Sequence, residues 1–248
     1  MIMKKGKYAK HGFAAKALIL GLALVTLMGT AVGGTLAWLM DDTDPVVNTF
    51  TDSDITIDLD ETTTTYKMIP GWTIAKDPYV TVEADSEDCW LFVKVTESPV
   101  PVLADYIQYN VNVDAVSTAK KTVGDEEFDV THGGWTKGNG TDVPANVYYR
   151  KVAAAKTNQY FAVLGSGTYT ADEVTYTWAD DEVLVKPEVT EQDMDAIAGD
   201  ADQPSLTFKA YAVQLFKTND NGSAEDTSDE FTAKEAWEKA LSMEPENA

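Results

Sequence analysis

Clusters of acidic side chains are the best candidates for a chemical site in this sequence. They gather at residues 41–44, 52–54 and 219–222. Carboxylate and amide oxygens are the ligands that Ca²⁺ prefers in proteins. The third run does not fit a calcium loop, because placing Gly222 at the sixth position puts Lys217, a cation, at the first. We therefore interpret all three runs as solvated turns. A Ca²⁺ site is the alternative, and no other metal or cofactor is predicted.

Histidine could supply catalysis, but the chain has only His11 and His132. The sequence contains no H-E-x-x-H pair for a zinc protease, no G-x-S-x-G and no phosphate-binding glycine loop. His132 precedes a glycine pair, so it is predicted to be an exposed loop residue. Metal ligand and general base are its alternatives. We accordingly predict no catalytic residue and no enzymatic activity.

Cys89 is the only cysteine, so no intramolecular disulfide can form. It begins the apolar run 89–93. A lone cysteine in such a run is typically a small buried hydrophobe. An intermolecular disulfide is the alternative.

The elements that would position these groups are short strands. Apolar runs, many of them alternating with polar residues, recur between turn residues, which is typical of strands in an all-β protein. The expected strands cover residues 55–60, 78–83, 89–95, 106–113, 147–152, 159–164, 174–178, 182–185 and 206–216.

Several further features complete the expected fold. The last predicted strand is apolar on both faces, which indicates a central strand covered on both sides. Helices are expected at 190–198, where Thr190 and Asp193 suit a capping box, and at 230–241. Pro70 followed by Gly71 suits a type II turn. The glycine- and asparagine-rich stretch 114–146 is predicted to be an exposed loop or hairpin insertion. The fold class is therefore an antiparallel β-sandwich with two short helices.

The N-terminus has the order of an export signal. Five lysines precede an uncharged segment, 17–40, and acid follows. Thr35 and Ala37 supply the small residues that a signal peptidase requires, so cleavage is expected between Ala37 and Trp38. The alternative is a retained anchor, since residues 17–39 could span a bilayer. Either way, the rest of the chain is expected outside the cytoplasm.

The charge limits the partners. The chain carries a net charge of −22, and removal of five lysines and no acid with residues 1–37 makes it −27. Nucleic acid binding needs clustered lysine and arginine, so this class of partner is excluded. Contact with a membrane is expected only through an uncleaved signal.

Cleavage would leave residues 38–52 as an N-terminal extension of a β-sandwich domain, 53–248. The extension holds an isolated β-prone hexamer after Pro45. The hexamer consists of Val46, Val47, Asn48, Thr49, Phe50 and Thr51. Such a segment can pair with its own sheet or complete the sheet of another subunit. The second option gives head-to-tail contacts that build fibres.

The run GGTLAWLMD at 33–41, followed by NTF at 48–50, resembles the exported TasA/camelysin family of Gram-positive bacteria. Residues 69–78 resemble that family's turn before a strand, and 210–214 with 231–237 resemble its closing strand and terminal helix. No motif matches between 99 and 204. The resemblance implies export through a SipW-type signal peptidase and a jelly-roll-like sandwich.

The resemblance further implies a secreted, structural cell-surface or biofilm-matrix fibre subunit, which associates with itself or with an accessory matrix protein. Two alternatives stay open. One is a camelysin-like surface endopeptidase. The other is a monomeric surface binding module that holds carbohydrate through Trp72, Trp135 or Trp178, although most of these tryptophans are expected in the core.

Overall fold

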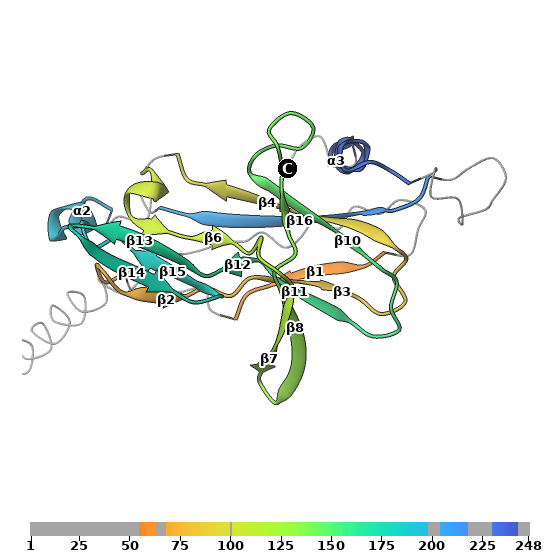
Figure 1. Cartoon of the computed structure of the whole chain (residues 1–248), viewed down its shortest axis with the longest axis horizontal. Coiled ribbons are helices and arrows are strands. Elements are labelled where there is room, and N and C mark those ends of the chain that lie inside the picture. The colour runs from red at the N-terminus through yellow and green to blue at the C-terminus, as the bar shows by residue number, and fades with distance from the viewer. Residues whose placement is uncertain (1–54, 63–67, 100, 198–203, 218–229, 243–248) are drawn as a thin grey trace, which may run out of the picture. The chain divides into compact units, whose positions relative to one another are not determined.

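The computed structural model describes residues 55–62, 68–99, 101–197, 204–217 and 230–242 (Figure 1). The chain divides into two units, Met1–Ala37 and Trp38–Ala248, and every described residue belongs to the second. The predicted signal, its cleavage site, the hexamer and the three acidic runs lie outside the described residues. In the described part, no helix has the length and apolarity needed to cross a membrane.

The described residues form an all-β fold, as predicted, and their strands are divided among five sheets (Figure 1). The five-stranded sheet contains, in spatial order, β1 (Ile57–Asp60), β3 (Tyr79–Val82), β11 (Gln159–Ala162), β8 (Glu126–His132) and β7 (Ser117–Val123). The four-stranded sheet contains β16 (Leu206–Gln214), β4 (Cys89–Glu97), β10 (Val147–Val152) and β9 (Thr136–Lys137). Neighbouring strands are antiparallel in both sheets except β11 and β8, which are parallel. The prediction of a purely antiparallel fold is therefore wrong for this one pair, whose strands are separated in the chain by β9 and β10 of the other sheet.

Three smaller sheets and the helices complete the fold. One sheet has the order β2 (Thr73–Ala75), β15 (Glu182–Val185) and β5 (Ile107–Gln108). The two remaining sheets pair β12 (Leu164–Gly165) with β6 (Asn110–Val111), and β13 (Gly167–Ala171) with β14 (Val174–Trp178). The described helices are a short 3₁₀ turn, η1 (Leu103–Asp105), and two α-helices, α2 (Glu191–Ala196) and α3 (Ala233–Ser242).

Strand β16 is buried on both faces, as its sequence predicts. Leu206, Phe208 and Ala210 belong to a core shared by the sheets. Tyr211 and Val213, on the opposite face, pack into a second core against α3. The prediction that β16 is a central strand is wrong for the described part of the sheet, where β16 is terminal. Helix α3 covers one face of β16 but does not cover the lateral edge of the strand. The strand is therefore buried on both faces although it has only one neighbouring strand in the described sheet.

The capping box at the start of α2 forms as the sequence predicts, whereas α3 begins at Ala233, three residues after its predicted start. The Thr190 side chain accepts a hydrogen bond from the Asp193 N–H at 3.2 Å, and the Asp193 carboxylate accepts one from the Thr190 N–H at 2.9 Å. This reciprocal capping box satisfies two backbone donors that a helix start leaves without partners. Thr232 and Glu235 make the same pair of bonds at the start of α3.

Two predicted strands are each divided in the structure, whereas the turn predicted at Pro70 and Gly71 forms as expected. The predicted strand 106–113 is divided at Tyr109 into β5 and β6, which pair in different sheets. The predicted strand 159–164 is divided at Val163, whose N–H donates to Pro78 O. Gly71, at φ +77°, takes the position that a type II turn reserves for glycine, and the Trp72 N–H closes that turn on Ile69 O at 3.0 Å.

The glycine-rich stretch 114–146 contains the β7/β8 hairpin, whose turn places Gly124 at φ +62°. The hairpin projects away from the other strands of its sheet (Figure 1).

The second core generates a stability prediction. Trp237 is 3% exposed and its ring lies 5.4 Å from Phe92 and 5.2 Å from Tyr211, centroid to centroid. Trp237→Ala should lower the free energy of unfolding by about 3–5 kcal/mol, because it removes a large buried ring and leaves a cavity. Urea denaturation measures the change. Leu241→Ala, on the exposed side of α3, is the matched control, and equal losses in both variants would contradict the assignment.

Candidate functional site

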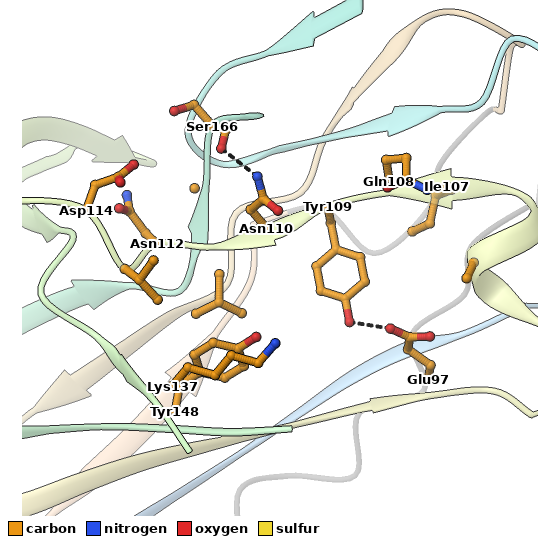
Figure 2. A pocket seen from close by; sticks show the side chains of 14 residues that line it. Glu97, Ile107, Gln108, Tyr109, Asn110, Asn112, Asp114, Lys137, Tyr148 and Ser166 are labelled. Carbon is orange, nitrogen blue, oxygen red and sulfur yellow. Dashed lines mark hydrogen bonds between the residues drawn. The ribbon is translucent and has the colours of Figure 1, made fainter. Parts of the chain in front are cut away.

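A polar groove opens on the surface of the described residues (Figure 2). It has a volume of about 470 Å³ and lies between the β5–β6 segment and strands β9 and β10. Its lining includes two tyrosines, two asparagines, two carboxylates and one lysine. These are Tyr109, Tyr148, Asn110, Asn112, Glu97, Asp114 and Lys137. The composition suits a hydroxyl-rich ligand better than an apolar one.

The β-strand pairing sets the two sides of the groove. Lys137 and Tyr148 are direct cross-strand partners of β9 and β10, so their side chains share one face. The Lys137 Nζ atom lies 5.9 Å from the centroid of the Tyr148 ring. On the other side, the break between β5 and β6 turns Tyr109 towards Glu97 (Figure 2).

Hydrogen bonds fix the groove side chains. The Tyr109 hydroxyl donates to Glu97 Oε1 at 2.6 Å, and Asn110 Nδ2 donates to Ser166 O at 3.0 Å (Figure 2). Burial raises the pKa of Tyr109 above its usual value, and the hydrogen bond and negative charge of Glu97 add to that rise. The phenol therefore stays protonated and holds its ring in place across the physiological pH range.

Next to the groove, the buried side chain of His132 lies near two carboxylates, the exposed Asp180 and the half-buried Asp181. Asn112 Nδ2 and the Ser166 N–H both donate to Asp180 Oδ1, at 3.3 and 2.8 Å. The second oxygen of Asp180 lies 3.6 Å from His132 Nδ1, and Asp181 Oδ2 lies 3.9 Å from His132 Nε2. Both separations exceed hydrogen-bond length. His132 Nδ1 and Asp181 Oδ1 are buried without a hydrogen-bond partner among the described residues.

The prediction that His132 is an exposed loop residue is wrong. It is the last residue of β8, pairs with Ser117 and is 7% exposed. The turn begins one residue later, where Gly133 and Gly134 have φ of +80° and +76°. A Cβ at Gly133 would lie 2.6 Å from Ala115 O, so this glycine allows the close approach that buries the neighbouring histidine. The glycine pair that suggested a loop in the sequence therefore marks only the turn.

Other residues singled out in the sequence lie mainly in the core. Trp135 and Trp178 are buried, and their indole N–H groups donate to Ala162 O at 2.7 Å and Gly165 O at 3.0 Å. Only Trp72, of the three tryptophans considered for carbohydrate, is exposed, at 66%. Cys89 is fully buried, as predicted, and burial raises the pKa of its thiol to about 12.

The described residues bring together no group of three or more His, Cys, Asp or Glu side chains placed to hold a metal ion. Within this part of the chain, the groove presents hydrogen-bonding groups and aromatic rings, which are typical of a ligand-binding surface. No local sequence pattern could have identified it, since its residues come from five separated segments.

Asp181 generates a pH prediction. Its burial raises the pKa of the carboxyl from 3.8 to about 6, although the positive charges of His132 and Lys121 act in the opposite direction. Between these pH values the folded protein holds a proton that the unfolded chain releases, so stability should fall as pH rises from about 4 to about 6.

The expected loss is on the order of 2 kcal/mol in the free energy of unfolding. Asp181→Asn should flatten the dependence in urea denaturation series measured across this range. Asp125→Asn, at the exposed hairpin turn, should leave the parent profile unchanged. A parent profile retained in Asp181→Asn would contradict the assignment.

No protein-family model matches this chain, and no match to it exists among the curated proteins or the solved structures compared with it.

Proposed function

We propose that this protein is an exported structural subunit that assembles into fibres at the cell surface or in the biofilm matrix of a Gram-positive bacterium. In this proposal residues 1–37 are a signal that a SipW-type peptidase removes after Ala37. The sheets form a jelly-roll-like sandwich, and subunits join by strand exchange, with themselves or with an accessory matrix protein. The role is structural, without catalysis.

The observation that carries the proposal is the lateral edge of β16. The Leu215 N–H donates to Asp88 O, and the Ser98 N–H donates to Ser205 O, so odd-numbered residues direct their backbone groups towards β4. In an antiparallel ladder the intervening residues direct theirs to the opposite side. Leu206, Phe208, Ala210 and Ala212 therefore present backbone groups to an edge that no described strand covers.

This edge has the features of an acceptor. A long edge strand invites pairing with another segment, because its row of backbone donors and acceptors is a template. The even-numbered side chains are buried in the shared core, so the strand is rigidly held. An extended segment could add to it through main-chain hydrogen bonds alone.

The β-prone hexamer 46–51 supplies the matching donor. It precedes β1, and β1 lies beside β16. Five residues separate Thr51 from Ile57, enough to span roughly 17 Å when extended. The hexamer can reach the edge of its own subunit or of a neighbour, and exchange between neighbours would make the open, fibre-forming contact.

Removal of the extension tests the proposal. The chain 38–248 should form filaments or a concentration-dependent ladder in size-exclusion chromatography and negative-stain microscopy. The chain 52–248 should remain monomeric, because it lacks the donor segment. Circular dichroism and thermal melting of both forms verify that each is folded.

Two proline variants provide a matched comparison. Asn48→Pro removes a backbone N–H from the middle of the hexamer and should abolish filaments. Thr43→Pro places the same residue in the preceding linker and should leave them intact. A folded 38–248 chain that stays monomeric across concentration and pH, or filaments that persist without residues 38–51, would overturn strand exchange.

A further inference from the structure

We propose that the groove lined by Tyr109 and Tyr148 is a binding site for a neutral oligosaccharide. This inference goes beyond the fibre-subunit function and does not depend on it, because the described residues that line the groove all lie between Glu97 and Ser166 in the sequence.

The groove is elongated. A second hollow of about 350 Å³ shares Glu97, Tyr109, Lys137 and Tyr148 with the first and continues past them to Ala145. The two hollows adjoin at these four shared residues, so together they extend along the surface past both tyrosines. An open channel of this form accommodates a chain of units rather than a compact small molecule.

The tyrosine rings are held before any ligand arrives. Tyr109 is fixed through its hydroxyl to Glu97, and Tyr148 is flanked by its cross-strand partner Lys137. Tyrosine combines a flat apolar face with a polar tip and loses little conformational entropy on binding. Two such rings along one channel suit the alternating apolar faces and hydroxyl rims of pyranose rings.

The surrounding polar atoms supply both kinds of hydrogen bond. Asn110 uses its Nδ2 on Ser166 O, which leaves its Oδ1 to accept from a ligand. Glu97 uses Oε1 on Tyr109, which leaves Oε2 as a further acceptor. Lys137 supplies an ammonium donor and makes no ion pair within the described residues. Ligand hydroxyl groups both donate and accept, so they can use all three partners.

Charge selects against other ligand classes. The lining has two carboxylates and one lysine, and the chain has a net charge of −22. A phosphate-rich ligand needs clustered cations, which this lining lacks. An apolar ligand would leave the asparagines and carboxylates of the lining desolvated without partners. A neutral polar chain meets neither obstacle.

Calorimetric titration of the chain 38–248 with chitotetraose and cellotetraose tests the proposal, with tetraalanine as the peptide probe. At least one saccharide should bind in the millimolar range or tighter. Tyr148→Ala and Asn110→Ala should each weaken that binding about tenfold, since each removes one anchoring contact. Asn110 is exposed, so Asn110→Ala should fold and can still test the proposal if Tyr148→Ala does not fold.

Tyr169→Ala is the matched control. Tyr169 is a strand residue whose hydroxyl donates to Glu188 Oε1 at 2.7 Å, as Tyr109 does to Glu97, but it lies outside the groove. Binding should be unchanged in this variant. Absence of binding to either saccharide, binding that survives both groove substitutions, or binding of tetraalanine in place of the saccharides would overturn the proposal. The titration measures saccharide binding and not filament formation. A negative result would therefore contradict the oligosaccharide site without bearing on strand exchange.

Discussion

The pairing of β16 with β4 is the interaction on which most of this fold depends. The two strands run antiparallel over nine residues each, from Leu206 opposite Glu97 to Gln214 opposite Cys89. Because side chains alternate across a strand, one pairing register serves two cores. A shift by one residue would exchange Phe208 and Ala210 with Lys209 and Tyr211, and would place a charged side chain in the shared core. Both cores therefore specify the same register.

A buried ion pair adds a second constraint on the same core. Lys76 is fully buried, and its ammonium donates to both carboxylate oxygens of Glu61, at 3.0 and 3.1 Å. The Lys76 Nζ atom also lies 5.5 Å from the Phe208 ring centroid. Such a pair gains little net stability, because desolvation offsets most of the attraction. Its value is geometric, since any arrangement that separates the two residues breaks both of these hydrogen bonds at a buried position.

The elements of this fold were largely predictable from sequence, whereas the groove was not. Apolar runs located β4 and β16 and the capping box located α2, because these signals are local. The segment 106–113 looked like one strand, and only the sheet partners of β5 and β6 required its break at Tyr109. That break is what turns Tyr109 into the groove. A site built from bends and distant cross-strand neighbours leaves no contiguous pattern to detect.

The same β4–β16 pairing has a consequence for how the chain folds. Ser98 and Ser205, whose hydrogen bond closes one end of the pair, are 107 positions apart in sequence. Strand β10, the other neighbour of β4, precedes β16 in the chain, so β4 can gain one partner long before the second. Contacts of such long range fold slowly and leave aggregation-prone intermediates. The rate at which β16 reaches β4 would therefore limit the yield of native protein separately from its final stability.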